Sequence, residues 1–326
     1  MELTVVIPAY NEQDNVEKAI HDIEAAFAEL DVPGEIVLVD DGSTDSTRAV
    51  ADTLAQSHTS LRVVSHPRNF GRGRALRTGF SEARGSIVIT IDADLSYSAD
   101  HIAPIYRTLA SDPSVDVVLG SPYMRGGSAV DVPLLRLAVS RLGNVILAKA
   151  LGGGIRTVTS ILRGYRKSVL DSLDLHSDGK EIHLEILSKV VAMGYQVKEV
   201  PATLTFRRKG RSKFRFRATT LSHLIFSISE RPMMIFGSIG LLLLLLGVVG
   251  GSYIIYLWRQ ARLNPDRPLM TLIVILIVTG MQVLAFGFIG TQIVSLRKEI
   301  FRIQKENMLL KKRLDKGDPP HDTRQL

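Results

Sequence analysis

Two aspartates at the end of a short apolar run are the residues best suited to hold a metal ion. Residues 87–91 are apolar or β-branched, which predicts a strand buried on both faces, and Asp92-Ala93-Asp94 follows directly. Alternation along an extended chain places Asp92 and Asp94 on the same side. At the carboxyl end of a parallel strand, two carboxylates could hold a divalent cation against a diphosphate. The alternative is an ordinary turn whose aspartates cap the next helix.

Apolar runs and helical segments alternate along the first 120 residues and must position these aspartates. Strands are predicted over residues 3–7, 35–39, 61–65, 87–91 and 115–119, with Pro8 ending the first. This alternation predicts a doubly wound, mostly parallel α/β sheet. Further on we expect a helix over 134–151, a possible strand over 158–165, a helix over 181–193 and a strand or hairpin over 195–206. Pro201 favours a sheet edge for the last of these.

A glycine-flanked basic segment, residues 69–79, opens the helix before the central strand. It carries Arg72, Arg74 and Arg77 close to Gly71 and Gly73. Such a segment could bind phosphate at a helix N-terminus. The three arginines could equally form a solvated face, and the sequence leaves both interpretations open.

Composition narrows the class of protein. The chain has 326 residues, 45% of them hydrophobic, no cysteine and a net charge of +7. Disulfides and thiolate metal sites are therefore excluded. Residues 207–217 carry seven basic side chains and no acidic one, directly before the most apolar region. That position favours a membrane surface or phosphate as the partner and predicts no nucleic-acid partner.

Two uncharged stretches, residues 233–258 and 269–296, are long enough to cross a bilayer of about 30 Å. Residues 218–230 have one apolar helical face, which predicts a helix lying in the membrane interface. Basic residues outside the two spans predict that both ends of the chain are cytoplasmic. Met1 and Glu2 lead directly into a strand, so we expect no signal peptide and an N-terminal domain that stays in the cytoplasm.

The expected domains follow from these features. Residues 1–206 form a cytoplasmic catalytic domain, and residues 207–232 form a basic segment with a juxtamembrane amphipathic helix. Transmembrane helices cover 233–258 and 269–296, and residues 297–326 form a charged helix with a disordered tail. The spacing of Ile300, Ile303, Asn307 and Leu310 suits a short coiled coil, so the terminal and transmembrane helices could form a homo-oligomer.

Four motifs in order resemble those of the family 2 glycosyltransferases. They are residues 5–12 (VVIPAYNE), residues 40–43 (DDGS), the 69–79 segment and Asp92-Ala93-Asp94. Residues 165–170 (YRKSVL) and 210–213 (GRSK) are similar to motifs of the polyprenyl-phosphate, dolichyl-phosphate mannose synthase-like branch. The resemblance covers residues 1 to about 217. It implies a GT-A type fold and a nucleotide-sugar donor bound over the carboxyl end of the sheet.

The resemblance also implies roles for individual residues. Tyr10, Glu12 and Asp41 would hold the base and ribose, and Asp92 and Asp94 would hold the diphosphate through Mg²⁺ or Mn²⁺. The implied nucleotide-sugar site consists of Pro8, Tyr10, Glu12, Asp41, Asp92, Ala93 and Asp94.

A second implied group of residues binds the acceptor. Arg136 and Ser140 lie four residues apart on one helix and would meet the acceptor phosphate together with Lys213. Arg208 and Lys213 would lie over the diphosphates. The residues expected to act in catalysis are therefore Asp92, Asp94, Arg136, Arg208 and Lys213.

Three positions depart from the pattern of this branch. Ser96 stands where a metal-contacting glutamine is common, and Pro122 stands where an arginine near the acceptor phosphate is common. Thr157 replaces an aspartate that could act as a base or organise the metal site. A phosphate acceptor lessens the last loss, because a monophosphate with a second pKa near 6 is largely a dianion at neutral pH and needs no strong base.

The predicted function is metal-assisted, inverting transfer of a sugar from a GDP- or UDP-linked donor to a polyprenyl or dolichyl phosphate. An alternative is a transferase acting on a polysaccharide or glycolipid acceptor. Processive synthases of this kind usually carry a Gln-x-x-Arg-Trp motif, whereas the single tryptophan here, Trp258, lies in a predicted span. Another alternative is a catalytically weak membrane scaffold that binds a nucleotide sugar, which the three departures favour.

Overall fold

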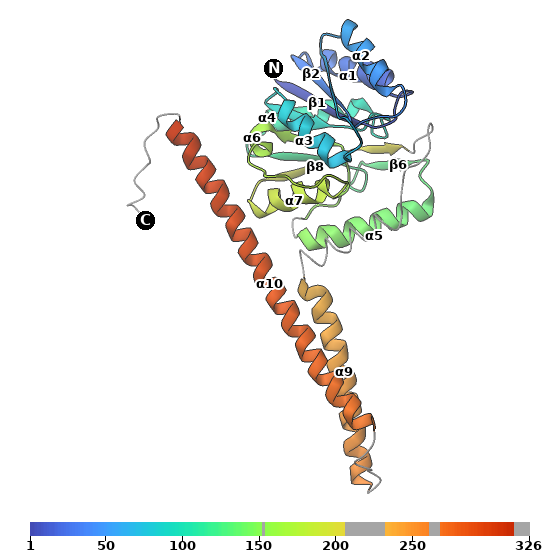
Figure 1. Cartoon of the computed structure of the whole chain (residues 1–326), viewed down its shortest axis with the longest axis vertical. Coiled ribbons are helices and arrows are strands. Elements are labelled where there is room, and N and C mark those ends of the chain that lie inside the picture. The colour runs from blue at the N-terminus through green and yellow to red at the C-terminus, as the bar shows by residue number, and fades with distance from the viewer. Residues whose placement is uncertain (152–153, 206–231, 261–267, 316–326) are drawn as a thin grey trace. The chain divides into compact units, whose positions relative to one another are not determined.

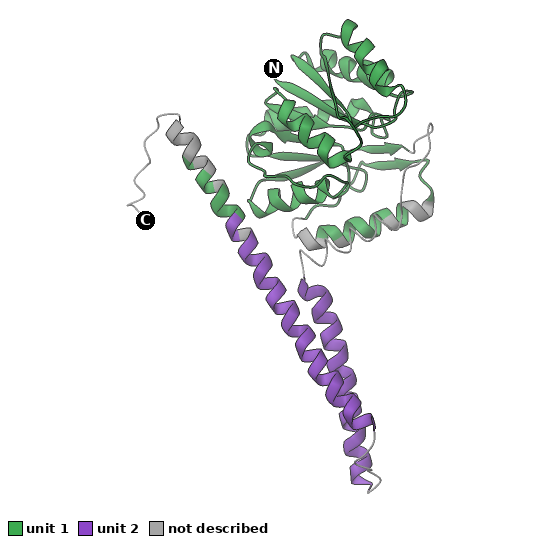
Figure 2. Ribbon diagram, viewed as in Figure 1, with its two compact units in different colours: residues 1–217, 301–326 green, residues 218–300 purple. Residues whose placement is uncertain are grey.

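The computed structural model describes residues 1–151, 154–205, 232–260 and 268–315. The chain divides into two compact units, residues 1–217 with 301–326 and residues 218–300 (Figure 2). The first unit is an α/β domain, and the second consists of apolar helices (Figure 1).

A seven-stranded sheet forms the centre of the first unit, in the order β3-β2-β1-β4-β7-β5-β8. All neighbouring strands are parallel except β7, which runs antiparallel to β4 and β5. The mostly parallel sheet expected from the sequence is therefore confirmed, and β8 lies at the edge that Pro201 favoured. The strands are β1 (Leu3–Ala9), β2 (Gly34–Asp40), β3 (Leu61–Ser65), β4 (Ile87–Thr90), β5 (Val117–Ser121), β7 (Arg163–Arg166) and β8 (Val197–Pro201).

Helices cover both faces of this sheet (Figure 1). The helical elements of this unit are α1 (Val16–Leu30), α2 (Thr47–Ser57), α3 (Arg72–Glu82), the 3₁₀ turn η1 (Ala99–His101), α4 (Ile102–Ser111), α5 (Leu134–Leu151), α6 (Lys167–Leu170) and α7 (Ile182–Ala192). α5 has the predicted bounds.

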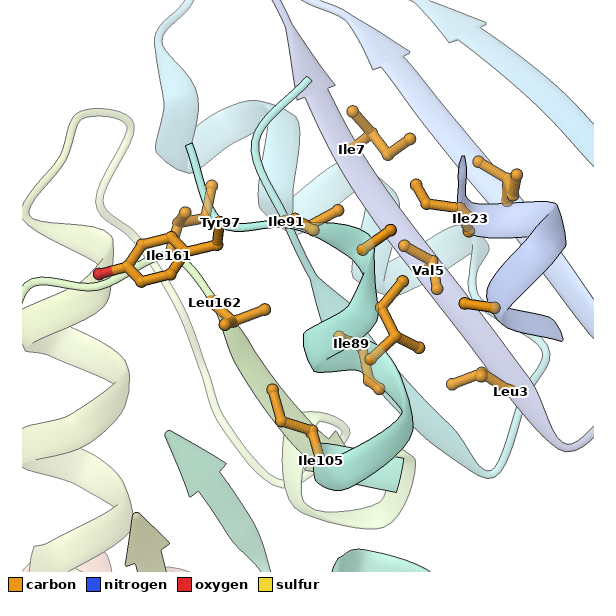
Figure 3. Close-up of a cluster of buried hydrophobic side chains, with 14 of the residues drawn as sticks. Leu3, Val5, Ile7, Ile23, Ile89, Ile91, Tyr97, Ile105, Ile161 and Leu162 are labelled. Atoms are coloured by element: carbon orange, nitrogen blue, oxygen red, sulfur yellow. The ribbon is translucent and has the colours of Figure 1, made fainter. Parts of the chain in front are cut away.

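Side-chain alternation along β1 divides the core between the two faces. Val5 is fully buried on the face where Ile23 of α1 and Ile105 of α4 pack (Figure 3). The intervening Val6 points to the opposite face, where a Cβ added to Gly79 of α3 would lie 2.3 Å from Val6 Cγ1. Glycine at position 79 therefore lets α3 approach the sheet closely. β1 lies between these two layers of side chains, and polar residues begin where β1 ends.

Two boundaries differ from the prediction. β1 continues through Pro8 to Ala9, because β4 pairs with β1 only as far as Val6 and the missing N–H of Pro8 leaves no gap on that side. The predicted strand over 158–165 is confined to β7, at 163–166, and the residues before it form a loop.

The last predicted strand divides at Pro201. β8 completes the large sheet, whereas β9 (Thr203–Thr205) pairs with β6 (Ser128–Val130) in a separate two-stranded parallel sheet. Thr205 is the last described residue before the basic segment. The amphipathic helix predicted over 218–230 and the basic run 207–217 lie outside the described residues.

The second unit contains α9 (Pro232–Arg259), which packs against α10 (Pro268–Asp315). Both helices are long and apolar enough to cross a membrane. They approach closely, since a Cβ added to Gly240 would lie 2.8 Å from the carbonyl oxygen of Gly280. α10 continues without a break from the predicted second span into the charged C-terminal helix.

Candidate active site

A cleft of about 640 Å³ opens where β1, β2 and β4 end. Parallel strands bring their carboxyl ends to one edge of the sheet, so segments distant in sequence meet there. The cleft brings together all seven residues expected at the nucleotide-sugar site, which are Pro8, Tyr10, Glu12, Asp41, Asp92, Ala93 and Asp94.

Asp92 and Asp94 lie in a tight turn immediately after β4. The N–H of Leu95 donates to the carbonyl of Asp92 at 3.1 Å. Leu95 has a positive φ of 48°, which residues other than glycine rarely adopt. Ser96 orients Asp94, because its N–H and hydroxyl donate to Asp94 Oδ1 at 3.0 and 2.7 Å. The turn thus holds both carboxylates at the cleft in a strained backbone conformation.

Burial and neighbouring charges of both signs affect the pKa of Asp92. Burial is the main cause that raises the pKa of Asp92, and the charges of Asp94 and Glu12 act in the same direction. Arg72 opposes them, with Nη2 at 3.0 Å from Asp92 Oδ1, and Lys180 opposes them more weakly.

The donor set at this turn fits a hard divalent cation. Two carboxylates face one cleft, and Mg²⁺ or Mn²⁺ prefers such oxygen ligands. Within the described parts of the chain, no group of three or more acidic, histidine or cysteine side chains forms a complete metal cluster. A metal held by Asp92 and Asp94 would thus take its other ligands from a diphosphate and water, as Mg²⁺ commonly does.

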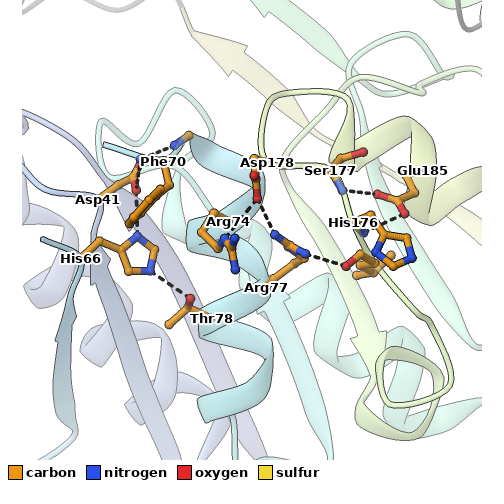
Figure 4. A network of polar contacts seen from close by, with 12 residues as sticks. Asp41, His66, Phe70, Arg74, Arg77, Thr78, His176, Ser177, Asp178 and Glu185 are labelled. Atoms are coloured by element: carbon orange, nitrogen blue, oxygen red, sulfur yellow. Dashed lines mark hydrogen bonds and ion pairs between the residues drawn. The ribbon is translucent and has the colours of Figure 1, made fainter. Parts of the chain in front are cut away.

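Asp41 orders the loop that leads into α3 (Figure 4). Its carboxylate accepts hydrogen bonds from the N–H groups of Phe70 at 3.0 Å and Gly71 at 2.7 Å, and it contacts His66 Nδ1 at 2.8 Å. Gly71 has a φ of 106°, a conformation that favours glycine. Asp41 therefore lines the cleft and also fixes the loop that delivers Arg72 to Asp92.

The first turn of α3 is bound by a loop that comes from far along the chain. The N–H groups of Gly73 and Arg74 donate to the carbonyl of Asp178 at 2.7 and 3.2 Å. Arg74 and Arg77 both pair with the Asp178 carboxylate (Figure 4). This contact occupies the N-terminus of α3, which the sequence indicated as a possible phosphate site. It also explains how Lys180 reaches the cleft.

The expected acceptor residues are placed in part. Ser140 of α5 lines the cleft, and its hydroxyl lies 2.7 Å from the Tyr123 hydroxyl. Arg136 belongs to the same helix, but its side chain is outside the described set. Arg208 and Lys213 also fall outside the described residues.

The last described residue before the basic segment, Thr205, lies at the cleft. Thr205 lines it and donates its N–H to the carbonyl of Ser96 at 2.8 Å. Ser96 is also the residue that orients Asp94. The end of β9 and the aspartate turn are therefore directly connected.

Thr157 also lines the cleft. It is buried, its hydroxyl lies 2.6 Å from that of Ser121, and its N–H donates to Glu199 Oε1 at 2.7 Å. Arg163, which is fully buried, donates to the carbonyls of Ser160 and His183 at 2.7 and 2.9 Å. These hydrogen bonds between side chains and backbone groups hold the loop before β7 in place.

The sequence does not predict the positions of Arg72, Lys180 and Tyr123 at the cleft. Arg72 was one of three equivalent arginines, and only the fold distinguishes the one that reaches Asp92. Lys180 and Tyr123 carry no local motif. The contact between the Asp178 loop and α3 places Lys180, and that contact spans about a hundred residues of sequence, so no local pattern could have revealed it.

Comparisons with known proteins identify the family of this chain. Residues 4–174 match the model of the family described as "Glycosyl transferase family 2". A polyprenol monophosphomannose synthase from Mycolicibacterium smegmatis is 32% identical, covering 69% of this chain and 85% of that protein. An undecaprenyl-phosphate 4-deoxy-4-formamido-L-arabinose transferase from Sodalis glossinidius is 29% identical and covers 89% of this chain and 88% of that protein.

A solved structure shares the fold. Glucosyl-3-phosphoglycerate synthase from Mycobacterium tuberculosis, crystallised with Mn²⁺, uridine diphosphate and glucosyl-3-phosphoglycerate, has a TM-score of 0.52 and 20% identity, covering 70% of this chain and 79% of that chain. The GT-A type fold expected from the sequence is thereby confirmed. This chain is a glycosyltransferase that belongs to glycosyl transferase family 2, and its curated relatives fall in the polyprenyl-phosphate branch of that family.

Proposed function

We propose that this enzyme transfers a sugar from a GDP- or UDP-linked donor to a polyprenyl phosphate at a membrane surface. The observation that carries the proposal is one cleft that joins the aspartate turn to the end of β9, the last described strand before the basic segment. Thr205 at the cleft bonds to Ser96, and two long apolar helices follow along the chain. The relatives named for polyprenol and undecaprenyl phosphate support the acceptor class.

The donor would lie over the carboxyl end of the sheet. Tyr10, Glu12 and Asp41 would hold the base and ribose, since all three line the same cleft as the aspartates. Asp92 and Asp94 would hold Mg²⁺ or Mn²⁺, which would neutralise charge on the diphosphate. The Mn²⁺ bound in the solved relative is consistent with this role.

The acceptor would enter from the side of α5 and the basic segment. Ser140, Arg136 and Lys213 would bind its phosphate, and Arg208 would lie over the diphosphate. Arg208 follows Thr205 by three positions, so at most about 10 Å of extended chain, at about 3.3 Å per residue, would separate their backbones. Positive side chains at this place would let two anionic substrates approach each other.

In the reaction, an oxygen of the acceptor phosphate would attack the anomeric carbon of the sugar. The bond from that carbon to the nucleoside diphosphate would break, and the diphosphate would leave with the bonding electrons. Inversion at the carbon follows from attack opposite the leaving group. The buried Thr157, whose hydroxyl contacts Ser121, is compatible with a nucleophile that already carries its negative charge.

The proposed setting is a membrane whose cytoplasmic side carries the catalytic unit and both ends of the chain. The basic residues outside α9 and α10 support this orientation. We further propose that the C-terminal part of α10, with Ile300 and Ile303 exposed, and the spans allow a homo-oligomer to form. Chemical crosslinking in membranes would test that assembly.

The test is transfer from radiolabelled GDP- and UDP-sugars to polyprenyl phosphate in membranes that contain the full chain. The proposal predicts a labelled glycolipid from one donor and none when neutral polyprenol replaces the phosphate. Label that appears in polysaccharide or in a diacylglycerol lipid would favour the alternative acceptors. Nucleotide binding without product from any donor would favour the membrane scaffold instead.

A further inference from the structure

Arg72 forms an ion pair with Asp92, one of the carboxylates on which the proposed metal site depends. Its Nη2 lies 3.0 Å from Asp92 Oδ1, and both side chains line the cleft. The proposed function assigns the same carboxylate to Mg²⁺ or Mn²⁺. A guanidinium and a divalent cation would therefore compete for one side chain.

The backbone on both sides of Arg72 is fixed. Gly71 donates its N–H to Asp41 Oδ2 at 2.7 Å, and Gly73 donates its N–H to the carbonyl of Asp178 at 2.7 Å. A change of partner at Arg72 would consequently require movement of the side chain alone. That side chain is 34% exposed, so its ion pair is partly screened and can exchange at low cost.

The charges around Asp92 explain why the partner should change. Asp94 and Glu12 add negative potential at Asp92, which makes a cation such as Arg72 favourable there. A divalent cation at the same carboxylate would repel Arg72. The donor diphosphate brings negative charge into the same cleft, and a guanidinium binds phosphate oxygens through paired hydrogen bonds.

We propose that Arg72 exchanges partners when the donor binds: it pairs with Asp92 before the donor binds and moves to the donor diphosphate when the metal binds Asp92. This inference rests on the proposed metal-assisted transfer. It makes metal binding weak in the absence of nucleotide and strong in its presence, so that the two bind together. Arg72 thereby also stabilises the charge that develops on the leaving diphosphate.

The first test measures the binding of Mn²⁺ to the full chain in detergent, without nucleotide. Electron paramagnetic resonance of the free Mn²⁺ gives the fraction that is bound. Arg72→Gln should bind Mn²⁺ about fivefold more tightly than the parent chain, because a competing, partly exposed ion pair is removed. The matched control is Arg68→Gln, which removes the same charge from an exposed side chain that stacks on the Phe70 ring at 5.0 Å. That control should leave Mn²⁺ binding unchanged.

The second test uses GDP and UDP against GMP and UMP, each with Mn²⁺ present. Arg72→Gln should weaken binding of the preferred diphosphate about tenfold and change binding of the corresponding monophosphate much less. A parent chain that binds no Mn²⁺ alone, beside an Arg72→Gln variant that does, would also support the exchange.

Equal or weaker Mn²⁺ binding by Arg72→Gln in the absence of nucleotide would overturn the inference, as would no binding by either chain. Asp94→Asn, measured with Mn²⁺ and the diphosphate, separates this failure from failure of the proposed function. If Asp94→Asn leaves Mn²⁺ binding intact, the proposed metal site is wrong. If it weakens binding while Arg72→Gln changes nothing, the exchange alone is wrong.

Discussion

Individual side chains at the cleft are held by neighbours that the reaction itself does not require. Asp41 binds the N–H groups of Phe70 and Gly71, and Ser96 binds Asp94. Such hydrogen bonds fix rotamers before any substrate arrives, which keeps the cost of ordering low when the donor binds. The site is thus preorganised on its donor side.

Thr157 provides a test of the acceptor chemistry at the residue scale. Thr157→Val keeps the shape and removes the hydroxyl that contacts Ser121 Oγ at 2.6 Å. We expect turnover to stay within about threefold of the parent chain because a phosphate dianion needs no base. Stability should fall by about 1 kcal/mol through the lost hydrogen bond.

Turnover and melting temperature, measured on the same preparation, check that expectation. A loss of turnover of about a hundredfold or more with the fold intact would mean that the Thr157 hydroxyl takes part in the reaction.

At this scale the sequence predicted which residues meet but not all of their contacts. Asp92 and Asp94 could be placed together because alternation along a strand is local. The choice of Arg72 over Arg74 and Arg77 depends on Asp178, which occupies the other two. No spacing rule contains that information, because the contact forms only when the sheet has been assembled.

At the scale of elements, the contact between α3 and the Asp178 loop determines what reaches the cleft. A Cβ added to Gly73 would lie 2.3 Å from the carbonyl oxygen of Ser177 and 2.7 Å from that of Gly179. Gly73→Ala should therefore displace the loop that carries Lys180, weaken donor binding about tenfold and cost about 2 kcal/mol of stability.

Donor KM and chemical denaturation check the Gly73 prediction. Gly143→Ala in α5 is the matched control, since nothing lies within 4 Å of its added Cβ. That substitution should be neutral or slightly stabilising in a helix. Equal effects of the two substitutions would show that close packing at Gly73 is not the cause.

Glu185 of α7 stabilises the same loop through charge. Burial alone would raise the pKa of Glu185, but hydrogen bonds from Lys189 and from the N–H groups of Ser177 and His176 lower it to about 2. A pKa lowered from 4.5 contributes stability that is present above about pH 4.5 and is lost as the pH falls toward 2.

Glu185→Gln should thus cost about 1 to 3 kcal/mol of unfolding free energy at pH 7, and the difference from the parent chain should shrink between about pH 4.5 and pH 2. Thermal unfolding in detergent across this range measures it. Glu29→Gln, at an exposed ion pair with Arg107, is the control and should change stability by less than about 0.5 kcal/mol. A pH-independent difference would contradict the assigned charge effect.

The sequence was more reliable for elements than for their ends. Hydrophobic periodicity predicted the alternating strands and helices, including the bounds of α5. It failed where pairing decides the boundary, as at Pro8, which remains in β1 because β4 no longer pairs with β1 there. The small sheet of β6 and β9 also depends on a distant pairing that periodicity does not record.

At the scale of the whole molecule, a soluble-type catalytic fold is followed by two helices long enough to cross a membrane. These helices were predicted well, because length and absence of charge suffice to define such a segment. The basic segment, residues 207–217, precedes these helices in the sequence and is where the lipid phosphate is proposed to bind.

Lys213→Ala tests that role. It should raise the KM for polyprenyl phosphate about tenfold, because one charge-assisted contact to phosphate is lost, while the chain stays in the membrane fraction. Lys198→Ala, at an exposed position of β8, is the control and should change neither quantity. Release of the Lys213 variant from membranes would instead assign the segment to anchoring.

The most direct measurement of the central claim is metal-dependent glycolipid formation by the parent chain and by Asp94→Asn, with and without EDTA. Transfer by the parent chain should stop in EDTA and return with Mg²⁺ or Mn²⁺. Asp94→Asn should be at least about a hundredfold slower with its fold intact, whereas Asp100→Asn, at an exposed position of η1, should match the parent. Full activity of Asp94→Asn, or transfer that continues in EDTA, would contradict the account.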